Sequence, residues 1–156
     1  MTGVQTCALP IYNIKGQSIV IEITEGLLLN VDSFVADRLL KFGEAGIQVA
    51  IDDFGTGYSS LSYLKKFDID YLKIDRSFVS NLKSCSDDMI LCEAIVLMAH
   101  RLGIKVIAEG IETEEQRELL TSIGCDFGQG YLFSHPIPAT DFEKLMIEVT
   151  QRLNFS

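Results

Sequence analysis

The sequence predicts an α/β fold made of five βα units whose strands run parallel. Two observations carry this prediction: short apolar segments alternate with amphipathic segments, and each apolar segment carries a polar or charged residue at or near its end. Such alternation is typical of parallel strands joined by right-handed crossovers. The polar residues are Glu22, Asp52, Lys73, Glu109 and Gln129. Because parallel strands finish at one edge, we expect these side chains to share one face.

The first two units precede residue 68. Ser18–Ile23 is an apolar run expected to form the first strand. Asp32–Glu44 is expected to be a helix, because apolar residues recur along it and a glycine follows its end. Ile47–Ile51 is the next expected strand. The glycines of Gly55-Thr56-Gly57 indicate a loop, and Ser59–Phe67 is expected to form a short helix.

The remaining units begin at the third expected strand, Asp70–Asp75. Ser86–Leu102 is expected to be the longest helix, since apolar residues recur near one face and Gly103 follows. Ile104–Ala108 is the fourth expected strand. A helix over Thr113–Ile123 is indicated by a capping box, in which Thr113 is followed three residues later by glutamine.

The last unit holds a short strand within Asp126–Phe133 and a helix over Thr140–Leu153, whose Thr140-x-x-Glu143 pattern indicates another capping box. Five strands permit two architectures. One is an open, doubly wound five-stranded sheet. The other is the C-terminal part of a TIM-like (β/α)₈ barrel, which takes roughly 250 residues when complete.

Composition narrows the class of protein. The chain has 156 residues, of which 47% are apolar and 22% charged, as in a single globular domain. A net charge of −9 argues against binding a DNA or RNA polymer through basic contacts to phosphate. No apolar run approaches the roughly 20 residues of a membrane span, so no membrane contact is expected from this segment. The four cysteines form no CxxC pair or zinc spacing, which favours reduced thiols in a cytoplasmic protein.

Residues 1–11 show neither helical nor strand periodicity and lack the basic and apolar regions of a signal peptide. Their sequence is similar to translated sequencing-adapter read-through. We therefore expect them to be a non-native segment that lies outside the fold.

The carboxylates among the strand-end residues indicate a metal site. Glu22, Asp52, Asp53 and Glu109 would gather at one face, where like charges repel unless cations are present. Oxygen ligands suit Mg²⁺ or Mn²⁺, and two such ions about 3.5–4 Å apart can activate a water against a phosphodiester. Singly, each residue has a plainer interpretation as a turn residue, helix cap or edge-strand side chain. Four strand ends in register favour the metal site.

Lys73 lies between two apolar residues, so its ammonium must form a pair or extend to solvent. One interpretation is a salt bridge with Asp75 or another neighbour. The other is a fixed positive charge that orients an attacking water or a phosphate oxygen, and the surrounding carboxylates favour it. The loop Gly55-Thr56-Gly57 is expected to be mobile and to complete the site, and Gln129 could offer an amide for hydrogen bonding.

Five ordered segments surround these residues: Glu22-Ile23-Thr24-Glu25, Ile51-Asp52-Asp53-Phe54-Gly55-Thr56-Gly57-Tyr58-Ser59-Ser60-Leu61, Leu72-Lys73-Ile74-Asp75, Ala108-Glu109-Gly110-Ile111-Glu112-Thr113 and Gln129-Gly130-Tyr131. Together they resemble the successive motifs of EAL-type cyclic di-GMP phosphodiesterases. The resemblance covers about Ile19 to Pro138. It implies a (β/α)₈-like barrel that hydrolyses cyclic di-GMP to the linear dinucleotide pGpG with two Mg²⁺ or Mn²⁺ ions. It also allows a homodimer.

The resemblance implies a role for each matched residue. Glu22, Asp52 and Asp53 would ligate metal, Glu109 would bind the second metal or its water, and Lys73 would contact the hydrolytic water. Five other residues would support or line the site: Glu25, Gly55, Thr56, Gly57 and Glu112. Of these, Glu25 would hold the glycine loop by hydrogen bonds. Gln129 would line the site near the water.

One departure from the family pattern is large. The name-giving Glu-Ala-Leu and a metal-binding asparagine precede the Glu22 motif in the family, and neither occurs here. We therefore expect residues 12–156 to be the C-terminal portion of a truncated EAL domain, with an incomplete metal site and little activity alone. One alternative is a catalytically degenerate module that binds cyclic di-GMP or a protein. A third is a truncated reading frame without independent function.

Overall fold

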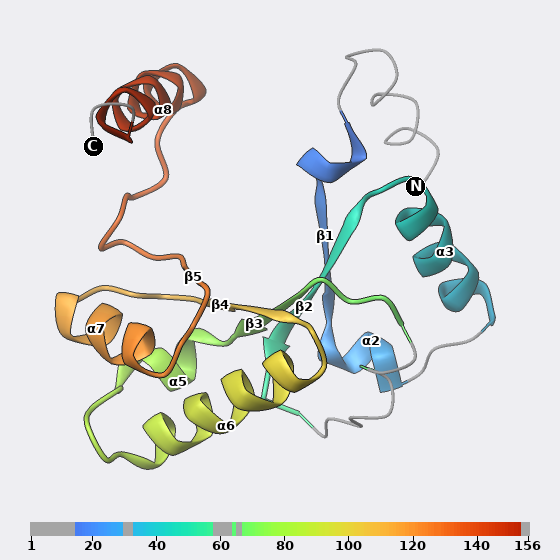
Figure 1. Ribbon diagram of the computed structural model, residues 1–156, viewed down its shortest axis with the longest axis horizontal. Coiled ribbons are helices and arrows are strands. Elements are labelled where there is room, and N and C mark those ends of the chain that lie inside the picture. The colour runs from blue at the N-terminus through green and yellow to red at the C-terminus, as the bar shows by residue number, and fades with distance from the viewer. Residues whose placement is uncertain (1–14, 30–32, 58–63, 65–66, 154–156) are drawn as a thin grey trace.

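The computed structural model describes residues 15–29, 33–57, 64 and 67–153 (Figure 1). Within them, five parallel strands form one sheet in the order β1-β2-β3-β4-β5. The strands are β1 (Val20–Thr24), β2 (Gln48–Phe54), β3 (Tyr71–Ile74), β4 (Lys105–Ala108) and β5 (Phe127–Gly128). Each strand pairs with its neighbours in sequence, whereas a doubly wound sheet reverses its strand order. The order is therefore that of a barrel section, and the doubly wound alternative is wrong.

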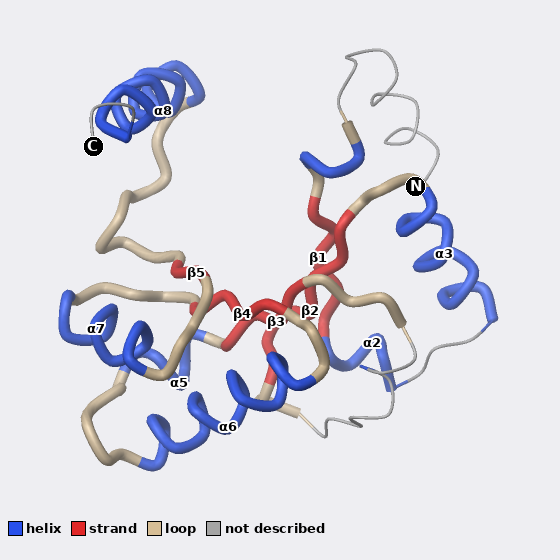
Figure 2. The backbone as a smooth tube through the Cα atoms, in the orientation of Figure 1, coloured by secondary structure: helices blue, strands red, loops and turns tan. Residues whose placement is uncertain are grey.

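Helices connect the strands, as Figure 2 shows. They are α2 (Glu25–Leu29), α3 (Ser33–Glu44), α5 (Arg76–Ser80), α6 (Asp87–Arg101), α7 (Glu114–Ser122) and α8 (Ala139–Leu153), with a 3₁₀ turn η1 (Gly16–Ser18) before β1. Helices α5, α6 and α7 lie together beside the sheet, and α8 stands apart at the end of an extended segment. None of the helices in the described ranges has the length and apolar character that crossing a bilayer requires.

The longer predicted elements agree with the structure to within a few residues. The predicted capping box is present at the start of α7, where the Thr113 side chain accepts from Gln116 N and the Gln116 side chain accepts from Thr113 N. Helices α2 and α5 were not predicted, because five residues are too few to show a helical period. The predicted helix over Ser59–Phe67 lies largely outside the described residues.

Near the C-terminus one prediction is confirmed and one was wrong in detail. The short fifth strand lies within the predicted Asp126–Phe133; it has two residues, because the chain turns away from the sheet after Gly128. The last helix begins at Ala139, so Thr140 lies inside its first turn and is not the N-cap. The backbone carbonyl of Pro138 accepts from Asp141 N and Phe142 N at 3.0 Å.

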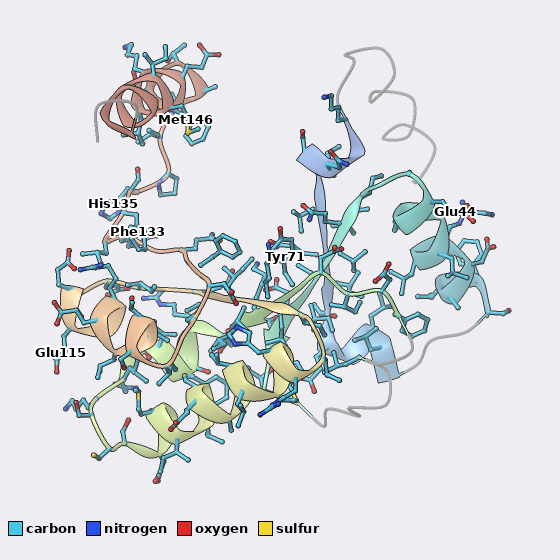
Figure 3. The ribbon with its side chains drawn as sticks, in the orientation of Figure 1. Glu44, Tyr71, Glu115, Phe133, His135 and Met146 are labelled. Carbon is cyan, nitrogen blue, oxygen red and sulfur yellow. The ribbon has the colours of Figure 1, made fainter. Side chains whose placement is uncertain are left out.

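The two faces of the sheet differ in chemistry. The residues that face the helices are apolar and buried: Ile23, Val49, Ile51, Leu72, Ile74, Val106 and Ala108. The opposite face carries Glu22, Asp52 and Lys73 near the strand ends, with Tyr71 below them. Tyr71 lies at the centre of the sheet (Figure 3), where its hydroxyl accepts a hydrogen bond from Gln48 Nε2 at 3.2 Å. Alternating side chains along each strand thus separate the core from the polar face.

Aspartates just before β3 and β5 tie each strand to its neighbour. Asp70 Oδ2 accepts from Val49 N, and Asp126 Oδ2 accepts from Val106 N, both at 2.8 Å. Asp126 also contacts His100 Nε2 at 2.9 Å. Partial burial opposes ionisation of Asp126, but the bonds to Val106 and His100 outweigh it and lower the pKa of this carboxyl.

We expect Asp126→Asn to destabilise the chain at pH 7 and to have little effect in acid. A carboxyl whose pKa is lowered by folding contributes stability above its ordinary pKa of about 3.9, and that contribution disappears as pH falls through the folded value. Urea unfolding at neutral pH and near pH 3 measures the difference. Asp68→Asn, at an exposed carboxylate, is the control. An equal loss of stability at both pH values would contradict the inference that the ionised Asp126 carboxylate stabilises the fold.

Two glycine substitutions are expected to act in opposite directions. A Cβ at Gly130 would lie 2.1 Å from Ile111 O, so Gly130→Ala forces the backbone to move and should cost about 2 kcal/mol or more. Gly43 lies inside α3 with nothing within 4 Å of its added Cβ, so Gly43→Ala should stabilise by about 0.5–1 kcal/mol. Urea unfolding measures the change in the free energy of unfolding for both variants. Changes of the same sign would contradict the difference in packing between the two glycines.

Candidate functional site

The centre of the site is the ammonium group of Lys73, which three carboxylates from other strands surround. Lys73 Nζ lies 2.8 Å from Glu22 Oε1, 3.0 Å from Asp52 Oδ1 and 2.7 Å from Glu109 Oε1. The lysine side chain is only 5% exposed. Burial opposes its charge, but the close carboxylates of Glu109, Glu22 and Asp52 outweigh burial and raise the pKa of Lys73. Four predicted site residues therefore meet, and the lysine forms ion pairs with carboxylates of neighbouring units, one of the two interpretations that the sequence left open.

A β-bulge separates the two adjacent aspartates. The register of β2 against β3 shifts between Ile51 and Phe54, and Asp53 has a left-handed φ of 56°. Asp52 lies beside Lys73, whereas Asp53 is exposed and interacts with Asp75. The charge of Asp52, then slight desolvation and the charge of Asp75, raises the pKa of Asp53. Bulges beside sites re-aim side chains in this way.

The glycine loop after β2 is held by Glu25. This residue starts α2 and is 6% exposed, and its Oε2 accepts a hydrogen bond from Gly55 N at 3.2 Å. Gly55 has φ of 98°, and a Cβ there would lie 3.0 Å from the Phe78 ring. Thr56 and Gly57 are exposed. The rest of the predicted loop, Tyr58-Ser59-Ser60, lies outside the described residues.

Arg76, a residue that no sequence pattern indicated, contacts the segment that follows β4. Arg76 Nη2 donates to Glu112 Oε1 at 2.7 Å. The Arg76 stem passes over Gly110, where an added Cβ would lie 2.3 Å from Arg76 Cγ. The absence of a side chain at Gly110 thus leaves room for the Arg76 stem, and Glu112 forms an ion pair with the Arg76 guanidinium. Only the fold joins these positions, because they lie on different βα units.

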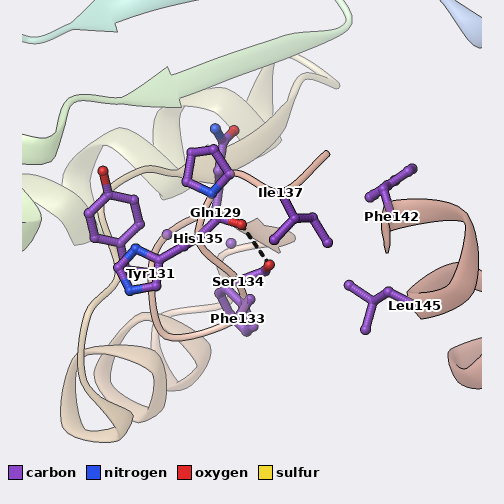
Figure 4. A pocket seen from close by; sticks show the side chains of 11 residues that line it. Gln129, Tyr131, Phe133, Ser134, His135, Ile137, Phe142 and Leu145 are labelled. Carbon is purple, nitrogen blue, oxygen red and sulfur yellow. Dashed lines mark hydrogen bonds between the residues drawn. The ribbon is translucent and has the colours of Figure 1, made fainter. Parts of the chain in front are cut away.

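Gln129 follows β5 at the edge where Glu109 follows β4. Its N–H donates to Ala108 O at 2.8 Å, and its carbonyl accepts from Ile111 N at 3.1 Å. Gln129 also lines a cavity of about 640 Å³ (Figure 4). The cavity wall comes from the segment after β5 and from Phe142 and Leu145 of α8. The rings of Tyr131 and His135, with centroids 4.2 Å apart and planes inclined by 30°, form part of this wall.

The donor set has the chemistry that a divalent cation requires. Asp52 Oδ1 is buried and, although it lies 3.0 Å from Lys73 Nζ, makes no hydrogen bond of good geometry. Such an oxygen can accept a cation, and carboxylates suit Mg²⁺ or Mn²⁺. In the part of the chain that the structure describes, however, no three His, Cys, Asp or Glu side chains are arranged to hold a metal ion. The carboxylates converge instead on the ammonium of Lys73, and the predicted metal centre stays a prediction.

Comparison with known proteins gives a consistent result. The model of the EAL domain family matches residues 5–136. The cyclic di-GMP phosphodiesterase NbdA of Pseudomonas aeruginosa is 43% identical over 81% of this chain, which spans 16% of that relative's length.

Solved structures match equally well. The phosphodiesterase PaMucR in its cyclic di-GMP complex is 39% identical, with a TM-score of 0.83 over 88% of this chain and 61% of its own. BlrP1 of Klebsiella pneumoniae, in a manganese and cyclic di-GMP complex, is 34% identical, with a TM-score of 0.78 over 86% of this chain and 34% of its own. These matches confirm the predicted α/β barrel fold over part of its length.

Loss of the central ammonium should destabilise the chain. In Lys73→Met the carboxylates of Glu22, Asp52 and Glu109 lose their shared partner and repel one another. We expect a cost of about 2–3 kcal/mol, below that of a fully buried pair because Glu22 is 50% exposed. The free energy of unfolding in urea measures this cost.

The control is Lys41→Met, which removes an exposed pair with Asp37 at 2.7 Å. Exposed helical pairs contribute roughly 0.5 kcal/mol or less. Equal losses in the two variants would show that the ammonium does not organise the strand ends.

Proposed function

Since this chain belongs to the EAL domain family, we propose that it is the C-terminal part of a metal-dependent phosphodiesterase that hydrolyses cyclic di-GMP to linear pGpG. The observation that carries the proposal is the meeting of Glu22, Asp52 and Glu109 around Lys73. The chain spans a minor part of the curated relatives it matches and 61% of PaMucR, so the activity belongs to a larger domain. The three described cysteines are free thiols, in keeping with a cytoplasmic location.

The chemistry is attack of a water oxygen on a phosphodiester phosphorus. A new P–O bond forms, the bond between phosphorus and the ribose 3′-oxygen breaks, and that oxygen takes up a proton and stays on the ribose as a hydroxyl. Glu22, Asp52, Asp53 and Glu109 would hold two divalent ions, which when bound activate the water and stabilise the leaving oxygen. Lys73 contributes a fixed positive charge and hydrogen-bond donors beside the water. Its buried stem and three partners keep the ammonium in one position, as electrostatic catalysis requires.

The surrounding residues position these groups. Glu25 holds the backbone of the glycine loop through Gly55 N, and this loop follows the aspartate bulge directly. Gln129 lies at the next strand end and opens onto the aromatic cavity. We expect the cavity to receive a guanine base, because its wall offers ring faces for stacking.

A binding module without catalysis is the second candidate. One observation favours it: the carboxylates already have a cation in Lys73, and the described residues hold no arranged metal-ligand set. A module of this kind would bind cyclic di-GMP with unchanged affinity when Mn²⁺ is removed. Titration calorimetry with cyclic di-GMP, in Mn²⁺ and in chelator, separates this candidate from the enzyme.

The chain alone is expected to hydrolyse little or no cyclic di-GMP. Chromatographic measurement of pGpG with Mg²⁺ or Mn²⁺ tests this expectation. Joining the upstream part of the NbdA domain to residue 12 should restore turnover. In the joined protein, Lys73→Met should lower kcat by roughly 10²–10³, the loss typical of one electrostatic group.

Lys105→Met is the matched control for that variant. Lys105 lies on the same sheet face but one layer away, opposite Tyr71 in the β3–β4 register, and its ammonium lies over the Phe127 ring. We expect kcat to change less than threefold, in line with the small effect of an exposed lysine. Binding without turnover in the joined protein would instead identify the second candidate.

A further inference from the structure

Gln116 carries a buried amide whose hydrogen-bonding positions are all occupied. It is the third residue of α7 and is only 7% exposed. Its Oε1 accepts from Glu112 N at 2.8 Å and from Thr113 N at 3.0 Å. Its Nε2 donates to Val79 O at 3.0 Å and to Ser80 O at 3.4 Å. A glutamine amide has two acceptor and two donor positions, so each of them has a partner.

These bonds exceed what a helix cap requires. In a capping box the side chain at the third helical position bonds to the N-cap N–H, which is Thr113 N in this chain. One further bond of Gln116 reaches the loop before α7, and two reach the last turn of α5. Helices α5 and α7 lie side by side (Figure 1). The amide of Gln116 therefore joins two βα units.

The two joined segments hold opposite partners of the lysine cluster. Helix α5 begins three residues after Lys73. The loop of residues 109–113 begins with Glu109, whose carboxylate lies 2.7 Å from Lys73 Nζ. This loop forms neither helix nor strand, so its position depends on contacts with neighbouring segments. Through α5 and this loop, Gln116 links the backbone that carries the ammonium to the backbone that carries the carboxylate.

A second link between α5 and the loop is more exposed. Arg76 Nη2 lies 2.7 Å from Glu112 Oε1, but the two side chains are 62% and 46% exposed. Exposed ion pairs contribute little, because water and salt screen them. The bond from Gln116 Nε2 to Val79 O is buried, and a hydrogen bond is stronger in such surroundings because the local dielectric constant is low. Gln116 is therefore the firmer of the two links.

We propose that Gln116 is a positioning residue that holds the Glu109 carboxylate against the Lys73 ammonium by fastening the loop after β4 to α5. Its amide bonds to backbone atoms, so it acts through the loop and not on the reacting groups. Its role in catalysis rests on the proposed phosphodiesterase function, whereas its effect on the lysine cluster does not.

A double-mutant cycle on the 156-residue chain tests the link between Gln116 and Lys73. Gln116→Met keeps a side chain of similar length and removes the amide bonds, so that Glu109 is no longer held beside the ammonium. The factor by which Lys73→Met raises the unfolding equilibrium constant should then be smaller by roughly fivefold or more than in the unaltered chain. Independent sites would give factors that agree within about twofold. Urea unfolding of the four proteins measures these factors.

Thr113→Ala is the matched control. It removes the hydroxyl that accepts from Gln116 N and so weakens the cap of the same helix, but it leaves the Gln116 amide in place. Lys73→Met should keep its full effect in this background. Gln116→Glu, which loses only the donors to α5, serves if Gln116→Met does not fold, and it should show the same coupling to Lys73. Additive effects of the Gln116 and Lys73 changes, or equal coupling from Thr113→Ala, would overturn the proposal.

Kinetics of the protein joined to the upstream NbdA segment test the role in catalysis. Gln116→Met should lower kcat by roughly ten- to a hundredfold and change KM less than about threefold, because a supporting residue orients a reacting group without touching the substrate. Thr113→Ala should change kcat less than about threefold. Equal kcat losses in the two variants would overturn the catalytic role. If the joined protein without substitutions shows no turnover, the proposed function fails, and the double-mutant cycle still decides the role of Gln116.

Discussion

The shared neutralisation of strand-end carboxylates by Lys73 is the interaction on which the site depends. Glu22, Asp52 and Glu109 come from three different βα units, and their like charges oppose the approach of the strand ends. One buried ammonium lies 2.7–3.0 Å from an oxygen of each of them and offsets their charge. The lysine can do so because its stem lies in the sheet, in register with Ile107 of the next strand.

The order of the strands brings the carboxylates together, and a β-bulge shapes the backbone at the two aspartates. Parallel strands in sequential order bring every C-terminal strand end to one edge, and the helices bury the other face under an apolar core. The two adjacent aspartates have different surroundings. Asp52 is drawn into the lysine cluster, while Asp53 stays exposed beside Asp75. A regular strand would also have placed them on opposite faces, but without the left-handed turn at Asp53.

Local signals predicted the elements that are long or capped. The capping box at Thr113 marked the start of α7 to the residue, and the glycine after α6 marked its end. The same kind of signal failed at Thr140, because the Thr-x-x-Glu pattern is compatible with any position in a first helical turn. Helices α2 and α5 escaped prediction because each is five residues long and is held by contacts with other units, from Gly55 N to Glu25 in α2 and from Gln116 Nε2 to Val79 O in α5.

The sequence by itself determined the alternation of strands and helices, the parallel sheet and the set of polar strand ends, because hydrophobic periodicity and turn chemistry are local properties. Its ordered motifs also determined the family. Only the tertiary structure decided which side chains meet: three carboxylates at Lys73, Arg76 across Gly110, and Glu25 against the glycine loop. The physical reason is that such contacts depend on register, on the bulge and on side-chain reach between units, none of which is encoded in the spacing of residues along one strand.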